Sequence, residues 1–165
     1  MGSFSTSEPG EGAADSGDRL AMLFVDERVG LTRMATLLVG SHAVAEEVVQ
    51  DAFIAVGDRW SSVERPGAYL RTSVVHGCAA VLRRREIEDR YTDRWRDERQ
   101  DEIPSQLVEL RDALDHLTER QRIVVVLRYF VDLPDNEIAG MLSVRPSTVR
   151  SLNRRALSTL RKELS

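Results

Sequence analysis

The chain has one cysteine, Cys78, among its 165 residues. A single thiol forms no internal disulfide and provides no thiolate cluster for a metal, so a disulfide-stapled secreted domain is excluded. The three histidines, His42, His76 and His116, fall in separate helical segments without the spacing of metal ligands. We therefore expect no metal site and no cofactor, and we expect Cys78 to be a small core residue rather than a nucleophile.

Long apolar runs are also missing, and the segment Ile123–Leu127 is typical of the longest. A helix that spans a bilayer needs about 20 consecutive apolar residues, so no membrane insertion is expected. The first residues lack the basic and apolar regions of a signal peptide. The sequence therefore predicts a reduced, cytoplasmic protein.

Residues that interrupt helices are scarce: the chain has five prolines, ten glycines and 5% aromatic residues. This composition favours helices over a sandwich or barrel. No glycine-rich phosphate loop and no Ser/His/Asp or Cys/His set is recognisable. We therefore expect an all-α protein that is not an enzyme.

Basic residues are fewer than acidic ones, 23 against 27, so the net charge is −4. Neutralisation of phosphates provides most of the affinity of a protein that binds duplex DNA unaided, and such proteins usually carry a positive excess. Any contact of this chain with DNA must therefore be local or assisted by a partner.

The first half of the chain is predicted to contain a tail and three helices. Residues 1–17 carry Ser, Gly, Glu and Pro with almost nothing apolar, which predicts a disordered tail. From there apolar residues recur at helical spacing. Gly40 ends the first helix, Ser41 caps the second, and Pro66 begins the third. Together they predict a three-helix bundle over residues 18–86.

The second half is predicted to be a separate helical domain over residues 107–165, joined to the first by a flexible linker at 87–106. Thr118–Gln121 has the form of a capping box. A short helix over 136–142, a turn at Ser143–Arg145 and a last helix from Pro146 form a helix-turn-helix signature.

Two of these helices carry strongly patterned charge. The last helix is basic and has no acid before Glu163, and hydroxyl groups and arginines at its start suit phosphates and base edges in a major groove. The second helix is acidic around Glu46, Glu47, Gln50 and Asp51. An acidic face alone most often indicates a solvated surface.

At these residues the chain resembles the extracytoplasmic-function sigma factors, the smallest members of the sigma-seventy superfamily. Residues 45–53 (AEEVVQDAF) resemble the polymerase-binding segment, and 66–71 (PGAYLR) the start of the promoter-melting segment. Residues 117–129, together with Glu137–Ala139 and Ser147–Arg150, resemble the start and the helix-turn-helix of region four. The resemblance covers about 20–86 and 107–164, in the family's order.

The resemblance implies a function: the chain would bind core RNA polymerase and direct promoter-specific initiation. The first domain would read the −10 element and the second the −35 element. Its implied partners are promoter DNA, the clamp helices of the largest polymerase subunit, the flap region and, in many members, an anti-sigma protein. The implied polymerase contacts are Glu46, Glu47, Gln50 and Asp51. The implied −10 and melting contacts are Trp60, Tyr69, Arg71, His76, Arg83 and Arg84. The implied −35 contacts are Arg145, Ser147, Thr148, Arg150, Ser151, Arg154 and Arg155.

The chain departs from the family pattern at a few positions. His76 replaces a frequent Asn, Ala79 and Ala80 replace polar or basic residues, and Ser143 stands where the turn usually has Gly. Leu152-Asn153 reverses the usual basic-then-apolar order. Two alternatives stay open: a stand-alone helix-turn-helix regulator, and a degenerate sigma factor that occupies polymerase without melting promoters.

Overall fold

The protein is described by a computed structural model that places residues 11–89 and 105–164. Within these two ranges every regular element is helical and there is no strand, as the sequence predicted. The elements are α1 (Glu11–Val39), α2 (His42–Asp58), η1 (Trp60–Ser62), α3 (Pro66–Asp89), α4 (Ser105–Asp115), α5 (Glu119–Val125), η3 (Val126–Phe130), α6 (Asp135–Leu142) and α7 (Pro146–Glu163).

Helices α1, α2 and α3 form the first block, a three-helix bundle in which each helix packs against the other two. Two neighbouring residues determine the connection between α1 and α2. Gly40 adopts a φ of 71°, a left-handed conformation that glycine takes without strain, and so ends α1. The Ser41 hydroxyl then accepts a hydrogen bond from the Val44 amide at 3.3 Å and caps α2. Both predicted boundaries are confirmed.

Two predicted boundaries of this block were wrong. Helix α1 begins at Glu11, so residues 11–17 are helical rather than part of a disordered tail. Acidic residues such as Asp15 suit a helix start because they oppose its positive end, and Arg19 lies 4.0 Å from Asp15 one turn on. Helix α3 extends to Asp89, past the expected end at 86. The linker expected over 87–106 falls mostly at 90–104, outside the described residues.

The second block contains α4 to α7. Thr118 caps α5 as predicted: its hydroxyl accepts from the Gln121 amide, and the Gln121 side chain accepts from the Thr118 amide. A π-helical turn, η3, then leads to the helix-turn-helix formed by α6 and α7. Ser143 ends α6 in a left-handed conformation with a φ of 54°.

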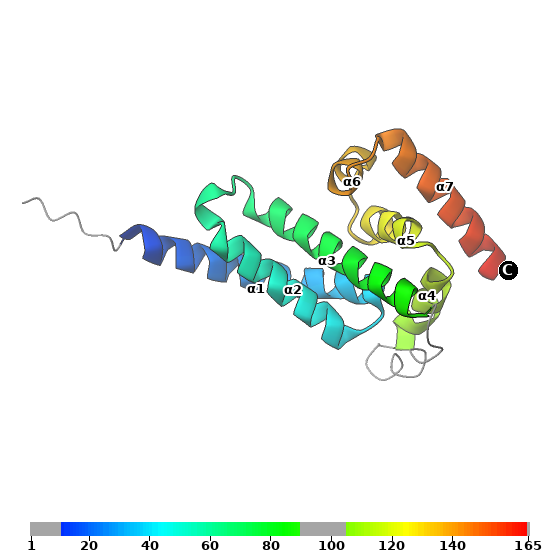
Figure 1. The fold of residues 1–165 in the computed structure, drawn as a ribbon, viewed down its shortest axis with the longest axis horizontal. Coiled ribbons are helices and arrows are strands. Elements are labelled where there is room, and N and C mark those ends of the chain that lie inside the picture. The colour runs from blue at the N-terminus through cyan, green and yellow to red at the C-terminus, as the bar shows by residue number, and fades with distance from the viewer. Residues whose placement is uncertain (1–10, 90–104, 165) are drawn as a thin grey trace, which may run out of the picture.

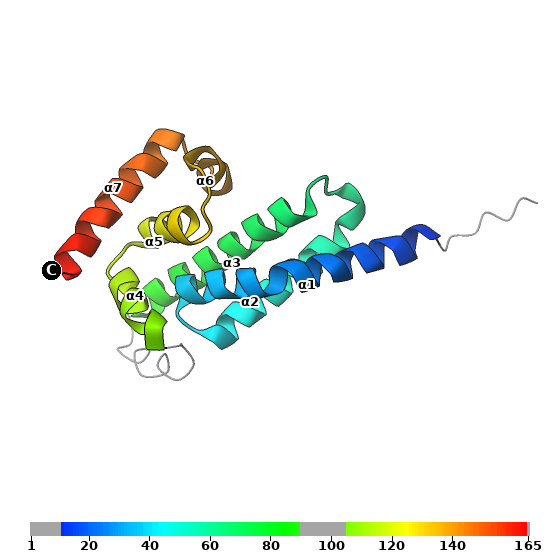
Figure 2. The same cartoon turned by 180° about the vertical axis from the view of Figure 1, so that it is seen from behind.

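The two blocks pack against each other. Helix α3 contacts α5, and α1 contacts η3. Figures 1 and 2, which view the molecule from opposite sides, both show α5 next to α3. Buried residues of both blocks form one contiguous hydrophobic cluster. The sequence predicted two helical domains, but not that they would share an interface.

Candidate polymerase-binding and DNA-binding surfaces

The acidic residues predicted to bind polymerase lie together on the exposed side of α2. The buried face of this helix consists of Ala45, Val48, Val49, Ala52, Phe53 and Val56. The helical period therefore turns Glu46, Glu47, Gln50 and Asp51 toward solvent, where all four are exposed. Within this surface Glu46 lies 3.5 Å from Arg28 and 3.4 Å from His42. The other acids face outward from the adjacent turns.

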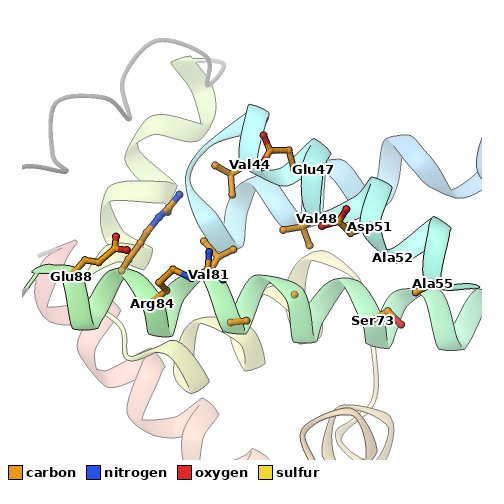
Figure 3. A pocket seen from close by; sticks show the side chains of 13 residues that line it. Val44, Glu47, Val48, Asp51, Ala52, Ala55, Ser73, Val81, Arg84 and Glu88 are labelled. Atoms are coloured by element: carbon orange, nitrogen blue, oxygen red, sulfur yellow. The ribbon is translucent and has the colours of Figure 1, made fainter.

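A groove of about 590 Å³ runs between α2 and α3 beside this acidic face. Glu47 and Asp51 stand on its α2 rim, and Arg84 stands on its α3 rim (Figure 3). At its floor Gly77 allows the helices to approach closely, because a Cβ there would lie 2.7 Å from Val48 Cγ1. The groove thus combines an apolar floor with charged rims, a form that suits a helix from another protein.

Three of the predicted −10 residues lie at one end of the first block. Trp60 opens the η1 turn, and the Arg19 guanidinium lies 5.9 Å from the centre of its ring. Tyr69 is half-buried in the first turns of α3, where its hydroxyl accepts a hydrogen bond from Arg59 at 3.2 Å. Arg71 follows on the same helix and is partly exposed. The three residues thus lie at the same end of the block, but Tyr69 and Arg71 are two positions apart on α3 and point from different faces of the helix.

The other three −10 residues lie further along α3 and on different faces. His76 and Arg83 point to the second block: His76 Nε2 donates to the Met141 carbonyl at 2.7 Å, and Arg83 lies 3.4 Å from Glu119. Arg84 points instead into the groove beside α2. Successive residues of a helix differ in direction by about 100°, which separates Arg83 from Arg84. The predicted −10 set is thus spread over η1 and several faces of α3 rather than gathered in one cluster.

The predicted −35 residues lie directly before α7 or within its first ten residues. Arg145 precedes the helix, which begins at Pro146. Arg145, Ser147, Arg150, Arg154 and Arg155 are exposed, and Thr148 and Ser151 are partly exposed. Val149 and Ala156 form the buried face of the helix. The structure therefore leaves the basic side of α7 available to a ligand.

A polar network that the sequence analysis missed supports this surface. Asp135, the first residue of α6, pairs with Arg128 of η3 and lies 3.8 Å from Arg150 of α7. Asn153 donates to the Tyr129 hydroxyl at 3.0 Å. Asn153 was noted only because it reversed the usual residue order. The tertiary structure gives it a role in joining α7 to η3.

A second missed feature surrounds the C-terminal end of α1. This helix has no basic residue in its own last turn, although the carbonyl end of a helix favours positive charge. Arginines from other elements occupy the position: Arg85 of α3 donates to the Val39 carbonyl, and Arg122 of α5 donates to the Leu38 carbonyl at 3.1 Å. Arg122 also lies 3.0 Å from Asp115. An arginine directly before the apolar run Ile123–Leu127 was the available signal for this site.

Cys78 lies in the core of the first block and is fully buried. Burial raises the pKa of its thiol from 9.0 to about 12, and the nearby Arg85 only partly opposes that rise. Among the described residues, no group of three His, Cys, Asp or Glu side chains could hold a metal ion. None of the described helices is both long enough and apolar enough to cross a bilayer.

The chain resembles known proteins along most of its length. Residues 113–162 match the protein family described as sigma-70, region 4. The RNA polymerase sigma-E factor of Streptomyces coelicolor is 32% identical over 140 residues, which cover 81% of this chain and 79% of that protein. The sigma-E factor of Streptomyces avermitilis is also 32% identical over 140 residues, covering 81% of this chain and 78% of that protein.

Solved structures share the fold of both blocks. The sigma factor RpoE of Bartonella quintana, solved with the anti-sigma factor NepR, superposes with a TM-score of 0.71 at 23% identity, covering 91% of this chain and 96% of that one. CnrH, solved with the cytosolic domain of CnrY, superposes with a TM-score of 0.68 at 21% identity, covering 92% and 94%.

Proposed function

The chain belongs to the RNA polymerase sigma factors, in their extracytoplasmic-function group, and we propose a division of labour between its two helical blocks. As a sigma factor it binds core RNA polymerase and directs initiation at specific promoters. We assign residues 18–86 to polymerase binding and the −10 element. We assign residues 107–165 to the −35 element.

The exposed acidic face of α2 is the observation that supports the polymerase contact. Glu47, Gln50 and Asp51 project into solvent next to the groove between α2 and α3. A basic partner surface complements this face, steers association and fixes its register. We assign this partner surface to the clamp helices of the largest polymerase subunit, and we assign a contact with the flap region to the second block.

The basic side of α7 supports the contact with duplex DNA. Arg150 and Arg154 are exposed one turn apart, and the hydroxyl of Ser147 lies in the first turn of the helix. Arginine reads guanine edges and phosphates, and hydroxyl groups donate to phosphates. The first block contributes the −10 contact through the end that carries Trp60 and Tyr69.

The net charge of −4 explains why both DNA contacts need polymerase. The chain as a whole lacks the positive excess that gives a DNA-binding protein its affinity. When polymerase holds both readers at a fixed spacing, the second contact becomes intramolecular and the two affinities combine. The protein accordingly contributes recognition and no catalysis of its own, and it acts in the cytoplasm, where bacterial polymerase transcribes.

An anti-sigma protein is a further partner that we assign to this chain. The structural relative RpoE was solved with the anti-sigma factor NepR, and CnrH was solved with the cytosolic domain of CnrY. Both the acidic face of α2 and the groove beside it are open to a competitor of polymerase.

Binding to purified core polymerase followed by run-off transcription on genomic fragments tests this function. We expect binding and a small set of discrete transcripts that the core enzyme alone does not produce. Absence of both would refute the proposal.

A mobility-shift assay distinguishes the sigma factor from a stand-alone regulator. It uses the promoters identified by run-off transcription, at physiological salt and without polymerase. Tight, specific binding by the protein alone would favour that regulator, which uses only the second block.

A degenerate sigma factor would instead bind polymerase without melting DNA. Permanganate footprinting detects unpaired thymines in an open complex. We expect reactive thymines near the start site, and their absence beside normal polymerase binding would favour the degenerate factor.

A further inference from the structure

We propose that Asp135 is a positioning residue for promoter recognition, because it holds the guanidinium of Arg150 in the direction from which that group reads a guanine of the −35 element. The inference rests on the −35 assignment of the second block proposed above. In this role Asp135 acts through Arg150 and does not itself touch DNA.

Asp135 is an acidic residue on a side of the molecule that is otherwise basic. It begins α6, which packs against α7 and lies beside the start of that helix in Figure 1. A hollow of about 220 Å³ between η3, α6 and α7 has four arginines in its lining, and Asp135 is the only acid among the residues that line it. A carboxylate at a DNA-binding surface repels phosphates and lowers the affinity for any duplex. Affinity alone therefore does not account for this residue.

The two carboxylate oxygens of Asp135 contact different arginines. Oδ1 pairs with Nη1 of Arg128 in η3, and Oδ2 lies 3.8 Å from Nη1 of Arg150 in α7. The side chain of Asp135 is only 19% exposed, whereas that of Arg150 is 63% exposed. Arg128 thus fixes the carboxylate from the protein side, and the carboxylate in turn meets Arg150 at the surface.

This contact leaves part of the Arg150 guanidinium available to DNA. A guanidinium is planar and carries five N–H donors in a rigid fork. Because Asp135 faces Nη1, Nε and Nη2 present a second pair of parallel donors. Guanine offers two acceptors, N7 and O6, that match such a pair in the major groove. Held by Asp135, Arg150 is therefore directed to one base rather than to the surrounding phosphates.

A second set of contacts fixes the same stretch of α7. Asn153 donates to the Tyr129 hydroxyl at 3.0 Å, and the Arg128 guanidinium lies 5.9 Å from the centre of the Tyr129 ring. Arg150 and Asn153 are three positions apart, so they share one face of α7. The contacts close a circuit through η3, α6 and α7, which fixes the rotation of the recognition helix about its axis.

The other predicted −35 arginines differ from Arg150 in this respect. Within the part of the chain that the structure describes, no carboxylate pairs with Arg145, Arg154 or Arg155. Their long, flexible side chains suit phosphates, which lie along the whole duplex. An exposed ion pair such as Asp135–Arg150 contributes little to stability, so we assign it to orientation. Arg150 is then the arginine of this set that reads a base.

Asp135→Asn tests the role because it removes the charge and keeps the shape of the side chain. Holoenzyme rebuilt with the variant is titrated on a promoter identified by run-off transcription and on fragments in which each −35 base pair is replaced in turn. We expect the preference for one G·C pair to fall about twofold to tenfold, the effect of losing the order of one long side chain. The preferences at the other positions should stay. An equal fall at all positions would show that Asp135 only supports the fold and would overturn the proposal.

Glu137→Gln is the matched control. It removes the same charge from the first turn of the same helix, at an exposed position, and should leave every base preference unchanged. Thermal melts establish that both variants are folded. Identical preferences in the two variants would contradict the positioning role.

A double-mutant cycle tests whether Asp135 acts through Arg150. Arg150→Ala should remove the same G·C preference, and adding Asp135→Asn should lower it no further, because the two residues then act as one unit. A further loss in the double variant would contradict the proposed route.

Nuclear spin relaxation of the arginine Nε–H groups in the ¹⁵N-labelled native chain needs no variant and no DNA. We expect a higher order parameter for Arg150 than for Arg154 and Arg155, since only Arg150 is held by a carboxylate. Equal order parameters would overturn the positioning role and leave the proposed function in place. A native holoenzyme without any base preference in the −35 element would instead refute the −35 assignment.

Discussion

Arg122 and Leu38 are 84 positions apart in the sequence, yet Arg122 Nη1 donates a hydrogen bond to the Leu38 carbonyl at 3.1 Å. The bond joins the second block to the end of the first helix. Arg122 also reaches Asp115 at 3.0 Å, so one guanidinium connects α1, α4 and α5. The packing of the blocks depends on this charged group as well as on apolar contacts.

Arg122→Met should lower the free energy of unfolding by about 1–3 kcal/mol, because a buried hydrogen bond from a charged donor is lost while the apolar stem is kept. Urea denaturation followed by circular dichroism measures the change. Arg120→Met, in the same helix but exposed, is the matched control and should change stability by less than about 0.5 kcal/mol. Equal midpoints for the two variants would contradict the assigned contact.

Asp51→Arg should abolish binding to core polymerase and leave the fold intact. Asp51 is exposed on α2, and an exposed charge change usually alters stability by under about 0.5 kcal/mol. Biolayer interferometry with core polymerase and a thermal melt measure the two effects. Asp26→Arg makes the same change on α1 and should retain binding. Retained binding by a folded Asp51→Arg protein would move the polymerase surface elsewhere.

Arg150→Ala should weaken use of promoters with a −35 element and reduce the slope of log affinity against log salt by about 1, if Arg150 contacts a phosphate. Titration of holoenzyme on promoter DNA at several salt concentrations gives both values. Lys162→Ala, in the last turn of the same helix, serves as the control. A slope and promoter profile equal to those of the control would assign recognition to other residues of α7.

Cys78 should react slowly with a disulfide reagent in the folded protein and rapidly in urea. Burial raises the pKa of the thiol from 9.0 to about 12. At pH 8 this shift alone lowers the thiolate fraction about a thousandfold, because each pKa unit is a factor of ten. Release of the coloured thiolate product, followed at 0 and 6 M urea, measures the two rates. Similar rates would contradict the burial.

The same shift predicts how stability depends on pH. A thiol whose pKa is raised on folding stabilises the native state below the unfolded pKa of 9.0, and the contribution is lost as pH rises toward about 12. The urea midpoint should therefore fall more steeply above pH 9 in the native sequence than in Cys78→Ala. Parallel pH profiles would show that Cys78 does not couple to folding.

Ser143→Gly should stabilise the second block by about 0.5–1 kcal/mol, because Ser143 adopts a φ of 54° that glycine takes without strain. A thermal melt detects the gain. Ser158→Gly, inside α7, should instead lower stability by about 0.5–1 kcal/mol. A loss of stability in both variants would show that Ser143 is not strained.

The sequence by itself determined the helices, their caps and the order of the functional segments. Gly40, Ser41 and Thr118 act within one or two turns of the chain, so their roles follow from neighbouring residues alone. The same is true of the acidic side of α2 and the basic side of α7, since helical period and residue type decide which side chains face solvent. The disordered tail was misjudged at 11–17, where continuation of α1 outweighed a composition poor in apolar residues.

The tertiary structure alone decided which of these surfaces meet. His76 and Met141 lie 65 positions apart, and only the packing of α3 against the second block brings them within 2.7 Å. The directions of Arg83 and Arg84, one toward Glu119 and the other into the groove beside α2, likewise depend on where the neighbouring helices lie. Hydrophobic burial is nondirectional, so apolar spacing identifies the face of a helix that is covered but not the helix that covers it.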